Sequence, residues 1–191
     1  ISVEVASLGV QVHGGMGFIE ETGAAQYYRD ARILPIYEGT TAIQANDLVG
    51  RKTARDGGAT AKTIAAHIEV TEAELRRSGS AAATAVLHSL QAARQSFVEV
   101  VDFVAGRTQA KPNEVFAGSV PYLMLAGNLV AGWQLARALL VAEQRLAEGI
   151  DAQFMRAKIA TAHFYADHIL SRVPGVAHSI VHGAAALAEM P

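Results

Sequence analysis

Apolar residues recur with the period of an α-helix over most of the chain after residue 60, and this pattern restricts the fold more than any other feature. Each stripe places residues three, four and seven positions apart on one helix face. The stripes cover residues 64–75, 86–104 and 155–169. We find no sustained alternation of apolar and polar residues, which a half-buried β-strand would need. The sequence therefore predicts an all-α protein.

Short segments rich in glycine, proline and polar residues separate the predicted helices. They lie at residues 78–80, 106–113, 148–151 and 173–175. Residues 1–52 differ from the remainder, because glycine-rich and charged turns there separate short helical segments. We expect residues 1–52 to belong to one helical domain and residues 53–80 to form a linker with a connecting helix. Residues 81–191 should form an additional bundle of about four helices.

Composition and charge exclude several kinds of function. The chain of 191 residues has a formal net charge of −2, so it lacks the positive field that attracts nucleic acid or an anionic membrane. It has no cysteine, which excludes disulfides, thiolate metal sites and cysteine nucleophiles. His178 and His182 share a helix face but lack the intervening glutamate of a zinc motif. We predict no metal site.

Residues 115–136 form an uncharged run that is long enough to cross a membrane. Pro121 and Asn128 interrupt this run, and no flank rich in Lys and Arg accompanies it. We expect instead a buried helix, at the centre of a bundle or at a subunit interface. Charged residues make up only 18% of the chain, below the quarter typical of soluble domains, so part of the surface should face other protein. We predict a homo-oligomer without a membrane span.

The segment PIYEGTTAIQ, residues 35–44, places a lone carboxylate directly before a helix-start signal. Thr41 and Gln44 match a capping box, so a helix should begin at about residue 40. Gly39 would let a ligand approach the backbone closely. Partial burial by the apolar residues before it would make Glu38 a stronger base, as general-base catalysis requires. The simpler alternative is that Glu38 only interacts with the helix dipole.

The segment QVHGGMGF, residues 11–18, is a glycine-rich turn that follows a predicted helix. Its backbone could approach a phosphate or a ring system. It is neither a GxGxxG after a strand nor a Walker loop, because no GK[ST] follows. The simpler alternative is a helix end followed by a turn.

Taken together, these segments resemble the C-terminal helical region of the flavin-dependent acyl-CoA dehydrogenases. The family pattern is Q-x-x-G-G-x-G, then R-D, then I-Y-E-G-T with a Q shortly after. The matching residues are Gln11, Gly14, Gly15, Gly17, Arg29, Asp30, Ile36, Tyr37, Glu38, Gly39, Thr40 and Gln44. Residues 121–140 and 157–170 are similar to the extra helical domain of longer members. The long bacterial enzymes of the 3-methylmercaptopropionyl-CoA dehydrogenase type resemble the chain most.

The resemblance implies that Glu38 is the catalytic base. It would remove the α-proton of an acyl-CoA thioester while the β-carbon gives a hydride to FAD. Tyr37 and Gly39 would bind substrate, and the Glu38 N–H would donate a hydrogen bond to the thioester carbonyl. The FAD-binding residues would be Gln11, Val12, His13, Gly14, Gly15, Thr40 and Gln44. In the family, the first five contact the adenosine-diphosphate part, often from a neighbouring subunit. Ala42 replaces a glutamine that many relatives have.

The resemblance further implies a cytoplasmic enzyme with electron-transfer flavoprotein as its acceptor. In the family, an N-terminal helical domain and a middle β-domain build the rest of the flavin site, and this sequence contains neither. We expect the C-terminal part of a longer enzyme, folded by itself but inactive and without bound FAD. Two alternatives remain open: a non-catalytic helical oligomerisation module of the same fold, and an acyl-CoA oxidase that uses the same base.

Overall fold

The computed structural model describes residues 1–187, and within these residues every regular element is a helix. The predicted all-α fold class is confirmed. The chain divides into two compact units, Ile1–Gln44 and Ala45–Pro191. Helix α4 (Thr41–Asp47) spans the division and continues into η2 (Leu48–Ala54), a π-helical segment.

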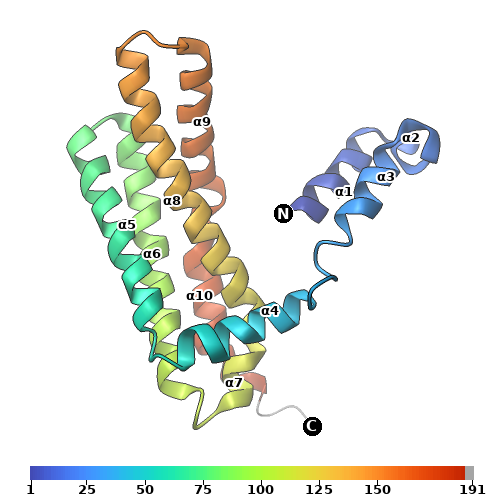
Figure 1. The fold of residues 1–191 in the computed structure, drawn as a ribbon, viewed down its shortest axis with the longest axis vertical. Helices are drawn as coiled ribbons and strands as arrows, with labels where there is room; N and C mark the ends of the chain where they lie inside the picture. The colour runs from blue at the N-terminus through green and yellow to red at the C-terminus, as the bar shows by residue number, and fades with distance from the viewer. Residues whose placement is uncertain (188–191) are drawn as a thin grey trace. The chain divides into compact units, whose positions relative to one another are not determined.

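The first unit is a small pair of helices. α1 (Ser2–Val12) packs beside α3 (Ala24–Ala31), and the two are joined through α2 (Gly15–Phe18) and the 3₁₀ segment η1 (Glu20–Thr22) (Figure 1). Neither α1 nor α3 contains a buried residue. The unit therefore lacks an apolar core of its own among the residues that the structure describes.

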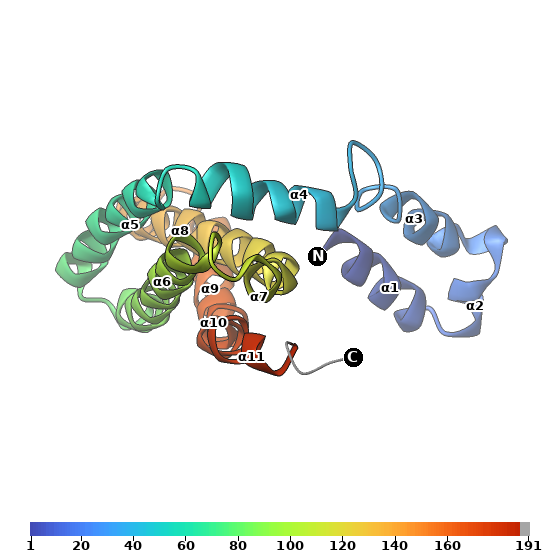
Figure 2. The same ribbon diagram turned by 90° about the horizontal axis from the view of Figure 1, so that it is seen from below.

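The second unit is a bundle of long helices. Its long elements are α5 (Ala59–Ser78), α6 (Ala81–Arg107), α8 (Ser119–Ala147), α9 (Ala152–His168) and α10 (Val173–His182). Its short elements are α7 (Pro112–Ala117), η3 (Leu170–Arg172) and α11 (Ala184–Leu187). α9 and α10 follow one another along the same side of the bundle, and Figure 2 shows the long helices nearly end-on.

The predicted apolar stripes form the core of this bundle. Fully buried side chains include Ile68, Leu75, Leu90, Val100, Leu129 and Leu139. Burial of each such side chain contributes roughly 1.5–3 kcal/mol. The turn at Gly79 and the loop at residues 148–151 fall where the sequence predicts breaks. Residue 80 lies in the short turn between α5 and α6, which pack against each other, so α5 is part of the bundle.

The uncharged run at residues 115–136 lies mostly inside α8. Its side chains Tyr122, Leu125 and Leu129 are buried within the bundle, whereas Met124 and Val130 are exposed. Of the two expected placements for this run, the structure shows the first, a helix buried within the bundle, because α8 packs against α5, α6, α9 and α10. Among the described residues, α8 is the one helix whose length and composition would allow it to cross a membrane.

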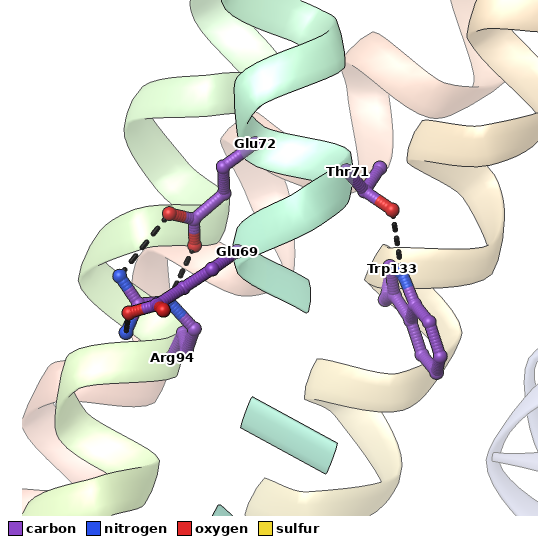
Figure 3. Close-up of polar contacts among 5 residues, drawn as sticks. All are labelled: Glu69, Thr71, Glu72, Arg94 and Trp133. Carbon is purple, nitrogen blue, oxygen red and sulfur yellow. Dashed lines mark hydrogen bonds and ion pairs between the residues drawn. The ribbon is translucent and has the colours of Figure 1, made fainter. Parts of the chain in front are cut away.

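Polar contacts connect α5 to its two neighbouring helices (Figure 3). The indole N–H of Trp133 on α8 donates to the Thr71 hydroxyl at 2.8 Å. On the other side, Arg94 on α6 forms ion pairs with Glu69 and Glu72. Because these contacts have directional geometry, they fix how the helices are aligned along their axes.

Candidate functional site

Glu38 lies between α3 and α4 in a backbone conformation that is unusual for a residue with a side chain. Its φ is 53° and that of Gly39 is 87°, so two successive residues occupy the left-handed region. Such conformations are costly and cluster at functional sites. Within the described residues, the backbone N–H groups of Glu38, Gly39 and Thr40 donate no hydrogen bond. These three N–H groups are therefore available to a ligand.

Gln44 holds the Glu38 loop from the first turn of α4. Its side-chain Nε2 donates to the backbone carbonyl of Glu38 at 2.6 Å. The N–H of Thr41 donates to the carbonyl of Pro35 at 3.2 Å. The predicted helix start at about residue 40 agrees with the structure. The predicted capping box is wrong, because Gln44 reaches past Thr41 to the Glu38 carbonyl.

Gly39 occupies a position that disfavours any side chain. A Cβ built there would lie 3.0 Å from Cγ2 of Ile43 and 3.4 Å from Nε2 of Gln44. Its φ of 87° would also strain any residue with a Cβ. Gly39 therefore keeps the loop close to α4 and leaves Gln44 free to hold the Glu38 carbonyl.

The Glu38 carboxylate is exposed in this chain. The expectation that Ile36 and Tyr37 partly bury it is wrong for the chain by itself, because these side chains are 51% and 52% exposed. Thr40 beside it is exposed as well. The loop thus presents its carboxylate, two apolar side chains and free N–H groups on an open surface.

The second group of candidate residues lies where α1 ends. The N–H of Gly14 donates to the Gln11 carbonyl at 3.0 Å, and Gly14 has a φ of 60°. A Cβ on Gly17 would lie 2.2 Å from the Val10 carbonyl oxygen, so only glycine allows this close approach. Gly14 and Gly15 have open space beside their Cα atoms, and the whole segment from Gln11 to Gly15, including Val12, is exposed.

A groove of about 230 Å³ lies beside this turn, between α1 and α3. Its lining residues are Ala6, Gly9, His13, Thr22, Ala24 and Tyr27. Nδ1 of His13 lies 2.9 Å from the Gly9 carbonyl oxygen, and the Thr22 hydroxyl donates to the Met16 carbonyl at 2.5 Å. Thr22 and Tyr27 were not among the predicted residues. Thr22 directly precedes the turn at Gly23, Tyr27 lies in the first turn of α3, and neither belongs to a motif.

The two groups of candidate residues are separate within the first unit. Gln11–Gly15 lie at the end of α1, whereas the Tyr37–Gln44 segment follows α3, which runs back along α1 (Figure 1). Within residues 1–187, no hydrogen bond or ion pair joins the groups, and no cluster of side chains is suited to hold a metal. The groups therefore form two separate candidate surfaces rather than one pocket.

Two known protein families match the chain, one over its N-terminal part and one over the remainder. The family described as "Acyl-CoA dehydrogenase, C-terminal domain" matches residues 1–52. The family described as "Acetyl-CoA dehydrogenase C-terminal like" matches residues 60–191, which is more than half of the chain. Both descriptions refer to the C-terminal region of an acyl- or acetyl-CoA dehydrogenase. The chain belongs to the acyl-CoA dehydrogenase family.

Individual relatives agree with this assignment. The chain is 60% identical, over 88% of its length, to the 3-methylmercaptopropionyl-CoA dehydrogenase of Ruegeria pomeroyi. It is 33% identical, over 84% of its length, to the broad-specificity linear acyl-CoA dehydrogenase FadE5 of Mycobacterium tuberculosis. The matched regions span 29% and 28% of these relatives, so the chain corresponds to less than a third of each.

Proposed function

We propose that this chain is the C-terminal part of an FAD-dependent acyl-CoA dehydrogenase that introduces a double bond between the α- and β-carbons of an acyl-CoA thioester. Glu38 is the base that removes the α-proton. The observation that carries the proposal is the Glu38 loop, which combines a carboxylate with unpaired backbone N–H groups. Family membership supports the reaction class.

The chemistry explains why a carboxylate and N–H donors are needed together. A proton α to a thioester is a weak acid, so a carboxylate can remove it only if the charge that develops on the carbonyl oxygen is stabilised. The N–H of Glu38 is a suitable donor, because it is unpaired and its loop is held by Gln44. Loss of one such donor typically lowers the rate about 10²–10³-fold.

The neighbouring residues have supporting roles in this proposal. Tyr37 offers a half-exposed apolar ring beside the carboxylate, against which the acyl group can pack. Gly39 presents bare backbone next to the Glu38 N–H, which leaves room for the thioester. Together they bind the substrate with its α-carbon near Glu38.

The residues assigned to FAD also fit that cofactor. FAD would accept the hydride from the β-carbon. Gly14 and Gly15 expose backbone with open space beside it, as the phosphates or adenosine of a dinucleotide need. Gln11, Val12 and His13 would make the adjoining contacts, with Thr40 and Gln44 on the other surface. Because the two surfaces are separate, we infer that residues 11–15 serve the FAD of a neighbouring subunit.

The proposal includes a homo-oligomer, a cytoplasmic location and electron-transfer flavoprotein as the electron acceptor. A relative from Acetobacterium woodii, 46% identical over 41 residues, is named as a subunit of a caffeyl-CoA reductase–Etf complex. Exposed apolar side chains of the first unit, including Leu8, Phe18, Tyr27 and Ile33, support association with other protein. An acyl-CoA oxidase remains the second candidate, since it would use the same base.

The test is the Glu38→Gln variant in the complete enzyme that carries this chain. Gln is nearly isosteric, so the loop and the binding of FAD and acyl-CoA should persist while the proton acceptor is lost. Flavin reduction at saturating substrate, followed as bleaching in a stopped-flow instrument, should slow by about 10²–10⁴-fold or more. Substrate affinity should change little.

Glu21→Gln is the matched control, because Glu21 is an exposed glutamate of the same unit that lies in neither group. It should reduce its flavin at the wild-type rate. A Glu38→Gln rate within about tenfold of wild type, a difference of only ~1.4 kcal/mol in barrier, would show that another group is the base. The non-catalytic module would then be the better interpretation. If flavin reduction is lost in Glu38→Gln and oxygen rapidly reoxidises the reduced wild-type flavin, the acyl-CoA oxidase is favoured.

A further inference from the structure

A second groove lies between α8 and α9 in the bundle. Its residues are far in sequence from the proposed active site. It has a volume of about 410 Å³. Its lining includes Arg137, Val141 and Arg145 from α8 and Phe154, Met155 and Lys158 from α9. Neither family resemblance nor the proposed reaction assigns these residues a role.

The groove combines three cations with an apolar floor. Arg137 and Arg145 are eight residues apart on α8, which separates them by about 12 Å along one helix face. Lys158 faces the same groove from α9. Among the described residues, none of the three forms an ion pair, and the lining contains no carboxylate. The positive charge of the groove is therefore uncompensated.

Two of these cations are held in place by aromatic rings. The guanidinium of Arg137 lies 5.7 Å from the centre of the Trp133 ring, and its Nη1 donates to Gln134 at 2.9 Å. Nζ of Lys158 lies 5.1 Å from the centre of the Phe154 ring. These contacts reduce the conformational freedom of both side chains, so less entropy is lost when they bind an anion.

The floor between the cations is apolar. It is formed by Val141, Ala142, Met155 and the ring of Phe154. Val141 is 53% exposed and Phe154 is 50% exposed, so the floor is open to a ligand. A simple inorganic anion would leave this surface uncovered, whereas a neutral hydrocarbon would leave the cations unpaired.

We propose that this groove binds an amphipathic anion, specifically a carboxylate with an aliphatic chain. Its carboxylate would pair with Arg145 and Lys158, and its chain would cover the apolar floor. Charge complementarity and volume both favour this class, because small-molecule pockets typically measure about 300–1,000 Å³. The proposal does not depend on the role of Glu38.

The chain contains one tryptophan, which makes Trp133 a reporter for the groove. Decanoate, kept below the concentration at which it forms micelles, should produce a saturable change in Trp133 fluorescence, because Arg137 both lines the groove and lies against the indole. Arg145→Gln combined with Lys158→Gln removes two cations but leaves the Arg137–Trp133 contact intact. The concentration of decanoate for half-saturation should then rise at least about tenfold.

Arg77→Gln combined with Arg156→Gln is the matched control, since it removes two exposed cations that do not line the groove. Its half-saturation should stay within about twofold of wild type. Decanol and decyltrimethylammonium, with the same chain but without the negative charge, should bind far more weakly than decanoate. Thermal unfolding of each variant checks that the fold is retained.

A second pair of variants tests the floor. Val141→Asp places a negative charge in the groove and should abolish the decanoate response. Val70→Asp changes a valine on α5 that is 59% exposed and should not. The proposal is overturned if decanoate produces no saturable change, if decanol titrates equally well, or if both charge-removing pairs weaken binding to the same extent.

Discussion

The carboxylate of Glu72 and the guanidinium of Arg94 form a two-point contact between α5 and α6 (Figure 3). Nε of Arg94 donates to Oε1 of Glu72 at 2.7 Å, and Nη2 donates to Oε2 at 3.1 Å. Glu72 is only 3% exposed, so the pair lies at the inner side of the helix interface. The hydrogen bonds to Glu72 raise the pKa of Arg94. A charged side chain that is this deeply buried depends on its partner.

Glu72→Gln should therefore destabilise the chain by about 3–5 kcal/mol, because it leaves the Arg94 charge without its buried partner. Glu69→Gln is the matched control. Glu69 also contacts Arg94, at 2.7 Å, but its side chain is 57% exposed. An exposed pair typically contributes less than about 1 kcal/mol. Urea denaturation measures both free energies of unfolding. Equal losses for the two variants would contradict the assigned role of Glu72.

Substitution by alanine at two glycines of α8 should change the stability of the chain in opposite directions. A Cβ on Gly132 would lie 2.6 Å from Cδ1 of the buried Leu170, so Gly132→Ala should cost roughly 1–3 kcal/mol through overpacking. Gly127 has nothing within 4 Å of its Cβ position. Gly127→Ala should stabilise the helix by up to about 1 kcal/mol. Thermal unfolding compares the two, and a stabilised Gly132→Ala would show that Leu170 can move aside.

Asp56 should make the stability of the bundle depend on pH. Hydrogen bonds from the Thr60 side chain, and then from the backbone N–H groups of Thr60 and Gly58, lower the pKa of Asp56 in the folded state. The stabilisation is therefore fully present above the unfolded-state pKa of about 3.9 and is lost as pH falls through the lower folded-state value. Asp56→Asn should destabilise at pH 7 but much less at pH 3. If Asp56→Asn lowers the free energy of unfolding more at pH 3 than at pH 7, this assignment is contradicted.

The helical bundle could be predicted from the sequence because local patterns determine it. The stripes through Ile68, Leu90 and Ala162 lie on the buried faces, since a helix of period 3.6 aligns such residues. The packing partners of α8 could not be predicted in the same way. An uncharged run can face a partner or its own bundle, and only the tertiary packing of Tyr122 and Leu125 distinguishes them.

The candidate site was predicted in part. Residues Glu38 and Gly39 could be singled out, since a lone carboxylate before a glycine is a local pattern. Their paired left-handed conformation and the hydrogen bond from Gln44 to the Glu38 carbonyl follow from how the loop closes, which the pattern alone does not determine. The groove that includes Thr22 joins separate segments and has no motif of its own. The roles of all these residues in catalysis stay predictions.

The last prediction concerns the unequal stability of the two units in the isolated chain. The bundle has a continuous apolar core, whereas α1 and α3 bury no residue of their own. Regions with few buried apolar contacts open with a small free energy, so their amide hydrogens exchange quickly. In hydrogen–deuterium exchange, the amides of α1 and α3 should exchange within seconds to minutes, and those of α6 and α8 should be protected far longer. The isolated chain should also purify without yellow colour, because it offers FAD two separate exposed surfaces and no enclosed pocket. In the complete enzyme, exchange in α1 and α3 should slow strongly, since the surrounding protein would cover their exposed apolar side chains. Equal protection of α1 and α6 in the isolated chain would show that the first unit is stable without such cover, and the proposed dependence of its two surfaces on other subunits would be wrong.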